Sequence, residues 1–329
     1  MEKLPRESVV VITGASSGIG RATALEFAKR RARLVLAARS RENLERTAEK
    51  CRKSGAEVLV VPTDVSREDE VQNLAQQAVD HFGRIDVWIN DAGVGLYSRF
   101  EQSPGDEYRQ VIETNLFGAI YGARAALKEF RRANSGLLIN VSSQTAFGGT
   151  PYSSAYAISK YGMRALSDTL RQELLGTGIR VCTVYPASTN TPFFQHAANY
   201  TGREVQPLGS VSDPRDVAKA IVRLVARPRP DTLVGKSGYV IEPLHWFATG
   251  AHARILRKKA DRDHFIEKSA RPGQGNLFTP ARFADERGGW KGSKLPGALF
   301  GAAGLIGGLF AWRRLASSRP RLRTVDRVA

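Results

Sequence analysis

Residues Ser8–Gly20 read Ser-Val-Val-Val-Ile-Thr-Gly-Ala-Ser-Ser-Gly-Ile-Gly, and a helical pattern follows from about Arg21 to Arg31. The first six residues form a β-branched run of the kind that is buried on both faces of a parallel sheet. A strand, a glycine-rich turn and a helix together can bind phosphate, because glycine lets the backbone approach the anion and the helix N-terminus faces it. The spacing is G-x-x-x-G-x-G, not the standard G-x-G-x-x-G. A turn that only packs a helix on a strand is the alternative, and the strand–helix context favours the phosphate site.

Apolar runs and helical patterns continue to alternate along the chain. Further strands are predicted over 33–38, 57–62, 85–90, 136–141, 179–185 and 232–241, with helices between most of them. Such alternation is typical of parallel sheets covered by helices on both faces. The sequence therefore predicts an α/β fold, a doubly wound parallel sheet (Rossmann-like) of about seven strands in a single domain.

The end of the second predicted strand bears on the choice of cofactor. It reads Ala37-Ala38-Arg39-Ser40-Arg41, with no carboxylate before Glu42. A carboxylate at this position would accept a hydrogen bond from the ribose 2′-hydroxyl of NAD. Arg39 can instead pair with a 2′-phosphate. Solvation of the strand end by Arg39 is the alternative, but the missing acid and the well-placed base together favour NADP.

Small and polar residues follow the next strands at the same edge of the predicted sheet. Asp64 could contact the adenine amino group or cap the next helix, and both roles can coexist. Asn90 is the last residue of the fourth predicted strand, and Ala92 and Gly93 follow it, where small residues admit the ribose. Asn115 lies in an apolar helical stretch and needs partners if buried, so it is either a structural bridge or an organiser of the active site.

Tyr156 and Lys160 are four residues apart in a helical stretch and so lie one turn apart on one face. An ammonium beside a phenol favours the phenolate and lowers the phenol pKa from about 10. Ser143 follows the strand 136–141 and could donate to a substrate carbonyl. The Tyr–Lys spacing alone is a weak signal, since an exposed tyrosine beside a solvated lysine has the same pattern.

Taken in order, these motifs resemble the classical short-chain dehydrogenase/reductase family over about residues 8–241. Thr13–Gly20 match its cofactor turn, and 90–93 match its Asn-Asn-Ala-Gly motif with Asp91 in place of the second Asn. Asn115, Ser143, Tyr156 and Lys160 match its catalytic tetrad. The segment 186–191 matches Pro-Gly-x-x-x-Thr with Ala187 in place of Gly. Neither departure removes a catalytic group.

The resemblance implies an NADP(H)-dependent oxidoreductase that transfers hydride between nicotinamide and a carbonyl or alcohol. It implies that Tyr156 is the general acid and base, that Lys160 lowers its pKa and holds the nicotinamide ribose, that Ser143 polarises the substrate oxygen, and that Asn115 keeps a water in a proton path. It also implies a homodimer or homotetramer. The residues expected to bind the cofactor are Gly14, Ser16, Ser17, Gly18, Ile19, Gly20, Arg39, Asp64, Asn90, Ala92, Gly93, Tyr156, Lys160 and Thr191.

Two further questions concern substrate and class of function. The stretch 193–212 is long and aromatic (Phe193, Phe194, Tyr200), which is typical of a lid over a hydrophobic carbonyl or alcohol substrate. His196 and His245 are interpreted as ordinary loop residues and left out of the site. The competing class is a non-catalytic NADPH-binding sensor or scaffold at a membrane. The four filled catalytic positions favour the enzyme.

The domain interpretation is a catalytic domain over 1–245, a docking helix over 246–270, a linker over 271–294, a membrane helix over 295–312 and a basic tail over 313–329. The docking helix carries Trp246, Phe247, Ile255, Leu256, Phe265 and Ile266. The linker is rich in Gly, Pro and charge. The segment 295–312 has no charge and about enough length, as a helix, to cross a hydrocarbon core, with small residues along one face. A glycine-rich soluble tail is the alternative, and a helix lying in the membrane interface is also open.

Charge and cysteine content limit the partners. The net charge is +17, and residues 251–329 hold 17 of the 49 Lys and Arg but only 6 of the 32 Asp and Glu. Because no nucleic-acid-binding pattern accompanies this excess, an anionic membrane surface is the expected attraction and nucleic acid is not. Cys51 and Cys182 offer no disulfide framework and no metal site. No signal peptide is predicted, so we expect the catalytic domain at the cytoplasmic face of a membrane.

Overall fold

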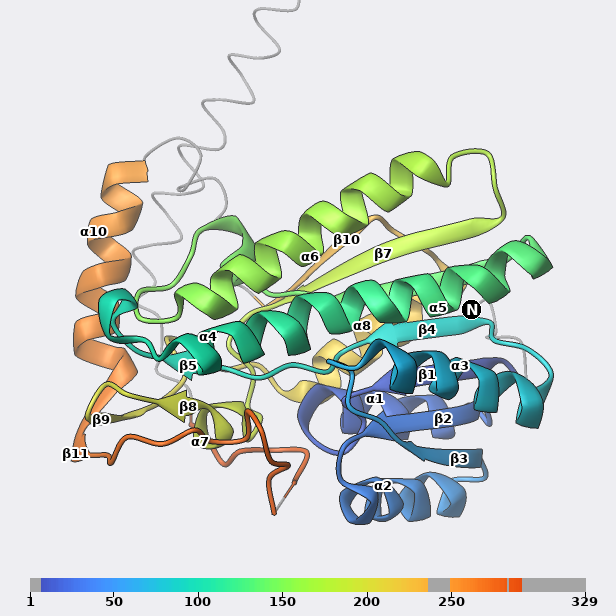
Figure 1. Ribbon diagram of the computed structural model, residues 1–329, viewed down its shortest axis with the longest axis horizontal. Coiled ribbons are helices and arrows are strands. Elements are labelled where there is room, and N and C mark those ends of the chain that lie inside the picture. Colours follow the sequence, from blue (N-terminus) through green and yellow to red (C-terminus); the bar gives the residue numbers. More distant parts are fainter. Residues whose placement is uncertain (1–6, 236–248, 283, 292–329) are drawn as a thin grey trace, which may run out of the picture.

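A computed structural model describes residues 7–235, 249–282 and 284–291. Its centre is a seven-stranded parallel sheet with the order β10-β7-β6-β4-β1-β2-β3 (Figure 1). The predicted fold class is therefore confirmed, and the first six strands agree with the sequence pattern to within a few residues; the last, predicted over 232–241, ends at Val234, and 236–241 lie outside the described residues. The seven strands are β1 (Val9–Thr13), β2 (Arg33–Ala38), β3 (Glu57–Pro62), β4 (Val87–Asn90), β6 (Gly136–Val141), β7 (Ile179–Pro186) and β10 (Asp231–Val234).

Helices cover both faces of the sheet. The principal helices are α1 (Gly18–Ala28), α2 (Arg41–Lys53), α3 (Glu68–Phe82), α4 (Gly105–Ile112), α5 (Gly118–Ala133), α6 (Ser154–Glu173) and α8 (Pro214–Ala226). One hydrophobic core joins the sheet to α1, α2 and α8, and a second joins it to α3, α5 and α6. Because helices cover both faces, the central strands are buried and mostly apolar: all five residues of β1 are buried, four of them Val or Ile.

Local sequence sets where several helices begin and end. Ser40 accepts a hydrogen bond from the Asn43 backbone N–H at the start of α2. Asp213 caps α8 in the same way, and Pro214 follows as its first residue. At the other end, α3 stops at Gly83, whose φ of 79° lies in the left-handed region that glycine favours. These signals keep the connections short and bring the carboxyl ends of the strands to one open edge.

Two small sheets and a C-terminal helix lie beside this edge. β5 (Leu96–Tyr97) pairs with β8 (Ala198–Asn199), and β9 (Arg203–Val205) pairs with β11 (Phe265–Ser269). The long predicted loop 193–212 thus contains α7 (Phe193–His196) and two of these short strands. α10 (Thr249–Lys259) and a π-helical turn, Ala260–His264, precede β11. The docking helix expected over 246–270 is therefore shorter, because its last residues pair as a strand.

The remaining C-terminal predictions fall partly outside the described residues. The predicted membrane helix, 295–312, the basic tail, 313–329, and His245, Trp246 and Phe247 lie outside them. In the described part of the chain, no helix combines the length and apolarity needed to cross a membrane. The predicted linker, 271–294, is described as far as residue 291 except for 283, and it packs against the domain instead of standing free.

Candidate active site

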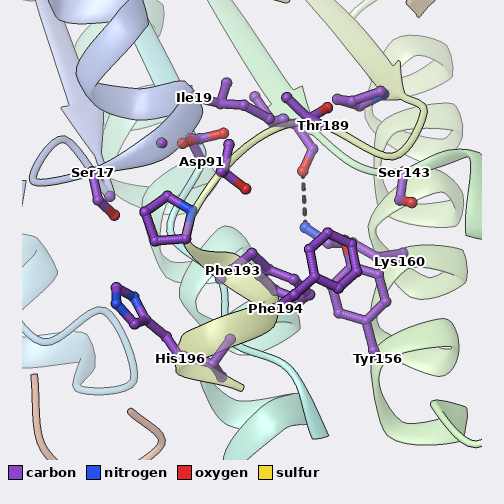
Figure 2. A pocket seen from close by; sticks show the side chains of 18 of the residues that line it. Ser17, Ile19, Asp91, Ser143, Tyr156, Lys160, Thr189, Phe193, Phe194 and His196 are labelled. Carbon is purple, nitrogen blue, oxygen red and sulfur yellow. Dashed lines mark hydrogen bonds between the residues drawn. The ribbon is translucent and has the colours of Figure 1, made fainter. Parts of the chain in front are cut away.

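A cavity of about 410 Å³ lies at the carboxyl ends of the sheet strands, at the edge where open α/β sheets bind ligands. It is continuous from the glycine-rich turn after β1 to the N-terminal half of α6. Most of the residues predicted for the site line it (Figure 2). These are Gly14, Ser16, Ser17, Gly18, Ile19, Arg39, Asp64, Ala92, Gly93, Ser143, Tyr156, Lys160 and Thr191. Gly20, Asn90 and Asn115 lie behind this lining.

The glycine-rich turn is shaped by close backbone contacts. Gly14 has a φ of +72°, and a Cβ on it would lie 2.8 Å from backbone atoms of Ala92. A Cβ on Gly20 would lie 2.3 Å from the Gly14 carbonyl oxygen. Only glycine fits at these two positions. The turn therefore brings the first residues of α1, whose backbone N–H groups lack helical partners, directly to the cavity.

Tyr156 and Lys160 face the cavity together, as the helical spacing predicts (Figure 2). The Lys160 Nζ atom lies 5.5 Å from the centroid of the Tyr156 ring and donates to the Val141 carbonyl oxygen at 2.9 Å. Lys160 is only 4% exposed, and the Ser142 hydroxyl donates to its backbone carbonyl. α6 is thereby fixed to the end of β6, and the lysine side chain has a single well-defined position.

The pKa of Tyr156 shows which effect dominates in this site. Burial raises it to about 12, the Ser143 hydroxyl opposes this by hydrogen bonding, and the negative charge of Asp91 adds to it. Burial is the largest effect, so the pKa of the phenol lies above its usual value and not below it. At neutral pH the tyrosine is a phenol, which is the form that can donate a proton.

Asp91 is the charged partner of Lys160. Burial raises the pKa of the Asp91 carboxyl and lowers that of the Lys160 ammonium, while their mutual attraction opposes both shifts. The Gly20 backbone N–H, in the first turn of α1, also stabilises the Asp91 carboxylate. Asp91 therefore links the glycine-rich turn to Lys160.

Asn115 lies on a π-helical turn, Glu113–Phe117, between α4 and α5, and is fully buried. Its side chain is bonded to both backbone polar groups of Val94 and donates to the Ser159 hydroxyl at 3.1 Å. Ser159 in turn donates to the Tyr156 carbonyl oxygen. Asn115 is therefore a structural bridge, which joins the loop after β4 to the helix that carries Tyr156.

Asn90 was predicted to bind cofactor, but its side chain turns away from the cavity. It accepts from Trp88 Nε1 at 2.8 Å and donates to the Ala119 carbonyl and to Asn140 Oδ1. These partners saturate the amide on the side of the sheet that faces α5 and α6. Asn90 therefore joins β4 to α5 and to β6, and its side chain does not line the cavity.

Arg39 and Asp64 lie at the far end of the cavity from Tyr156. Asp64 accepts from the Ser66 backbone N–H and hydroxyl, so it shapes the turn before α3 while lining the cavity. Arg39 donates to the backbone carbonyls of Leu277 and Asn276, at 2.8 and 2.5 Å. Burial lowers the pKa of Arg39, and the charge of Asp64 opposes this shift.

Sequence reasoning missed part of the lining. The aromatic loop supplies Phe193 and Phe194 as expected, and His196, which was left out, also lines the cavity. The Phe193 ring centroid lies 5.3 Å from that of Tyr156. Eight residues from the C-terminal region also line the cavity; of these, Ile255 and Leu256 are among the apolar residues of the predicted docking helix, whereas no motif marks the others. The eight are Ile255, Leu256, Lys259, His264, Asn276, Pro280, Ala281 and Ala284.

Comparison with known proteins identifies related sequences. The family model described as short chain dehydrogenase matches residues 8–200. An uncharacterized oxidoreductase of Bacillus subtilis, YxnA, is 30% identical over 323 residues, which cover 93% of this chain and 90% of that protein. Its match therefore extends well beyond residue 245. An uncharacterized oxidoreductase of Staphylococcus saprophyticus is 39% identical over 196 residues, covering 59% of this chain and 79% of that protein.

Solved structures with this fold include complexes with nicotinamide cofactors. A short chain dehydrogenase/reductase from Burkholderia phymatum in complex with NAD has a TM-score of 0.68 and 27% identity, covering 81% of this chain and all of that one. An alcohol dehydrogenase from the archaeon Thermococcus sibiricus, complexed with 5-hydroxy-NADP, has a TM-score of 0.63 and 29% identity. That match covers 70% of this chain and 96% of that one.

Proposed function

This chain belongs to the short chain dehydrogenase family of oxidoreductases, and from that premise we propose that it is an NADP(H)-dependent enzyme that interconverts a hydrophobic carbonyl compound and its alcohol. The observation that carries the proposal is one cavity lined at one end by the glycine-rich turn and at the other by Ser143, Tyr156 and Lys160. Binding groups and acid–base groups thus share a single space.

The residues present fit a dinucleotide. The N-terminal end of α1, where the helix dipole is positive, and the two glycines without room for a Cβ suit a pyrophosphate; the Gly18 N–H itself donates to the Asp285 carbonyl. Small residues after β4 (Ala92 and Gly93) leave room for a ribose near Lys160, whose Nζ would lie 3.8 Å from a Cβ on Gly93. When bound, the nicotinamide supplies or accepts the hydride.

Proton transfer to and from the substrate is carried out by the side chains on α6 and after β6. The Tyr156 hydroxyl, held protonated by burial, donates its proton to the carbonyl oxygen of the substrate as negative charge develops there. The Ser143 hydroxyl stabilises the same oxygen and the phenolate that remains. Lys160, fixed by the Val141 carbonyl, keeps a buried positive charge beside the ring and near the ribose. In the reverse direction, the phenolate removes the proton of the alcohol.

The preference for NADP rests on Arg39. In the described part of the chain this guanidinium bonds only to two neutral carbonyls, so its charge is not neutralised by a hydrogen-bonded carboxylate. Three of its five N–H groups are left, enough to bind a 2′-phosphate. Arg39→Asp should weaken NADPH binding at least tenfold more than NADH binding in fluorescence titrations. Equal losses for the two cofactors would refute the 2′-phosphate assignment.

The preference for a hydrophobic substrate rests on the lining near Tyr156. Phe193, Phe194, Leu208, Ile255 and Leu256 all face the cavity there. The test is NADPH oxidation with a panel of hydrophobic ketones and aldehydes and of small sugars and acids. We expect turnover only with the hydrophobic members, and a loss of roughly 10² or more in kcat for Tyr156→Phe with unchanged NADPH binding. Turnover restricted to sugars and acids would overturn the substrate class.

Membrane association is proposed from the sequence of residues 295–312 alone. The full-length protein should float with anionic lipid vesicles at physiological salt, whereas a chain ending at residue 294 should not. If both chains stay in the aqueous fraction, this part of the proposal is wrong. The oligomeric state, expected to be a dimer or tetramer, is tested by light scattering of the full chain.

A further inference from the structure

The region with the most unexplained contacts is the C-terminal strap, defined here as residues 276–290 apart from 283. It lies outside the part of the chain that the family model matches. Its composition predicted a linker, yet in the structure it follows the edge of the cavity from end to end. Figure 1 shows the orange-to-red trace after β11 running past α7 towards α1.

At the Arg39 end, the strap is held by its own backbone carbonyls. Arg39 donates to the carbonyls of Asn276 and Leu277, and Asn43 Nδ2 donates to the Ala281 carbonyl at 3.1 Å. The Leu277 side chain is fully buried, in a cluster that also includes Val94 and Tyr156. A single apolar anchor and three hydrogen bonds thus fix the first part of the strap over the end of β2 and the start of α2.

The strap then crosses the glycine-rich turn. The Gly18 backbone N–H, at the start of α1, donates to the Asp285 carbonyl at 2.9 Å, and Arg21 donates to the Ala284 carbonyl. Beyond this point, Trp290 Nε1 donates to the carbonyl of Thr191, the residue expected beside the nicotinamide. The strap therefore contacts the site at the positions expected for the 2′-phosphate, the pyrophosphate and the nicotinamide.

The strap borders the cavity and does not fill it. Asn276, Pro280, Ala281 and Ala284 are lining residues of the same 410 Å³ space that reaches Tyr156 and Lys160. Near the strap, the side-chain oxygens of Asn43 and Asn276 are buried and have no hydrogen-bond partner in the part of the chain described. Buried acceptors of this kind suit a ligand that brings its own donors, such as ribose hydroxyls or an adenine amino group.

We propose that the C-terminal strap is an additional wall of the cofactor site, which closes over the adenosine half of the dinucleotide and slows its release. Arg39 acts here as a positioning residue, because it holds the strap through two carbonyls and also lines the cavity. This inference rests on the proposed nicotinamide cofactor. It does not depend on which carbonyl compound is reduced.

Two ion pairs allow the strap to be loosened without changing the cavity lining. Arg215 on α8 pairs with Glu286 at 2.6 Å, and Asp213 pairs with Arg287 at 2.6 Å. None of these four residues lines the cavity. Asp213 also caps α8, so the first pair is the better target. Arg215→Glu and Glu286→Arg each replace an attraction by a repulsion, and the double variant restores the pair with reversed polarity.

The experiment is stopped-flow release of NADPH from the full-length protein, followed by its fluorescence after mixing with excess unlabelled NADP. Each single variant should release NADPH roughly threefold to tenfold faster than the wild type, and the double variant should return to within about twofold. Equal release rates in all four proteins would overturn the inference. Tighter NADPH binding in the single variants would also overturn it, because the strap would then compete with the cofactor.

The role of Arg39 is tested without cofactor. Limited trypsin digestion of the strap, which exposes Arg282 and Arg287, should be several-fold faster in Arg39→Lys than in the wild type. Lysine keeps the charge but lacks the planar fork that reaches two carbonyls. NADPH should slow cleavage of the wild type. Unchanged cleavage in Arg39→Lys would show that Arg39 does not hold the strap.

The outcomes separate this inference from the proposed reaction. If the wild type binds NADPH and responds to the charge reversals but reduces no carbonyl compound, the strap stands and the proposed reaction fails. If carbonyl compounds are reduced with NADPH but the charge reversals do not change the release rates, the proposed reaction stands and the role of the strap is wrong. If the wild type binds no nicotinamide dinucleotide, both are wrong.

Discussion

Replacement of Asn90 by alanine should destabilise the protein strongly while leaving its affinity for NADPH nearly unchanged. Asn90 is 3% exposed and makes three side-chain hydrogen bonds, with Trp88, Ala119 and Asn140. A buried polar group left without its partner costs roughly 1–3 kcal/mol. With three partners affected and some relaxation, Asn90→Ala should lower the free energy of unfolding by about 3–6 kcal/mol.

The network around Asn90 predicts a graded series. Asn140 also donates to the Ser167 hydroxyl, and Ser167 donates to the Met163 carbonyl on α6. Asn140→Ala affects two of these bonds and should cost about 2–4 kcal/mol, whereas Ser167→Ala should cost about 1–2 kcal/mol. These hydrogen bonds run from β4 through β6 to α6. Because α6 carries Tyr156 and Lys160, they also fix the position of these two side chains relative to the sheet.

The assay is urea unfolding followed by circular dichroism, together with NADPH titration of each folded variant. Asn43→Ala is the matched control: Asn43 is equally buried, but its side-chain amide donates to the Ala281 carbonyl of the strap, and it lines the cavity. It should lose more NADPH affinity than Asn90→Ala and less stability. A loss below about 1 kcal/mol for Asn90→Ala, combined with weakened NADPH binding, would refute the structural assignment.

Three further predictions concern the cavity. Burial raises the pKa of Tyr156 to about 12 and lowers that of Lys160, so at alkaline pH the ammonium loses its charge while the phenol is still protonated; kcat for carbonyl reduction should therefore be flat near neutral pH and fall before Tyr156 titrates, and a profile that stays flat up to about pH 10 would contradict this. Gly20→Ala places a Cβ 2.3 Å from the Gly14 carbonyl and should abolish measurable NADPH binding, whereas Gly105→Ala, which meets nothing within 4 Å, should not. Phe193→Ala should raise KM for a hydrophobic ketone roughly 10- to 100-fold, with little change in KM for NADPH; equal changes in both would count against a substrate contact.

Much of the fold was predictable because it depends on patterns that are local in the sequence. Runs such as Val9–Ile12 are apolar on both faces, and glycine and proline mark the ends of elements, so the central strands and most helices follow from spacing alone. Tyr156 and Lys160 were predictable for the same reason, since one helical turn separates them.

Other parts depend on contacts between distant residues, and the sequence carries no sign of them. Asn90 ends the strand after which Ala92 and Gly93, expected to bind the cofactor, follow, but its bonds to α5 and β6 turn its side chain to the other side of the sheet. The strap is held by main-chain carbonyls, which every residue has, so its Gly- and Pro-rich composition indicated a linker. The pKa of Tyr156 depends on burial, which the spacing of Tyr156 and Lys160 does not report.

The central claim is that one cavity brings a nicotinamide and the Tyr156 hydroxyl to the same substrate carbon and oxygen. The most direct measurement is mass spectrometry of the alcohol formed from a hydrophobic ketone with NADPH deuterated at nicotinamide C4. The account predicts one deuterium on the carbinol carbon of the wild-type product and, for Tyr156→Phe, a rate lower by roughly 10² to 10⁴ at unchanged NADPH affinity. The deuterium is placed on each face of C4 in turn. A product that carries no deuterium with either labelled cofactor, or full activity of Tyr156→Phe, would contradict the account.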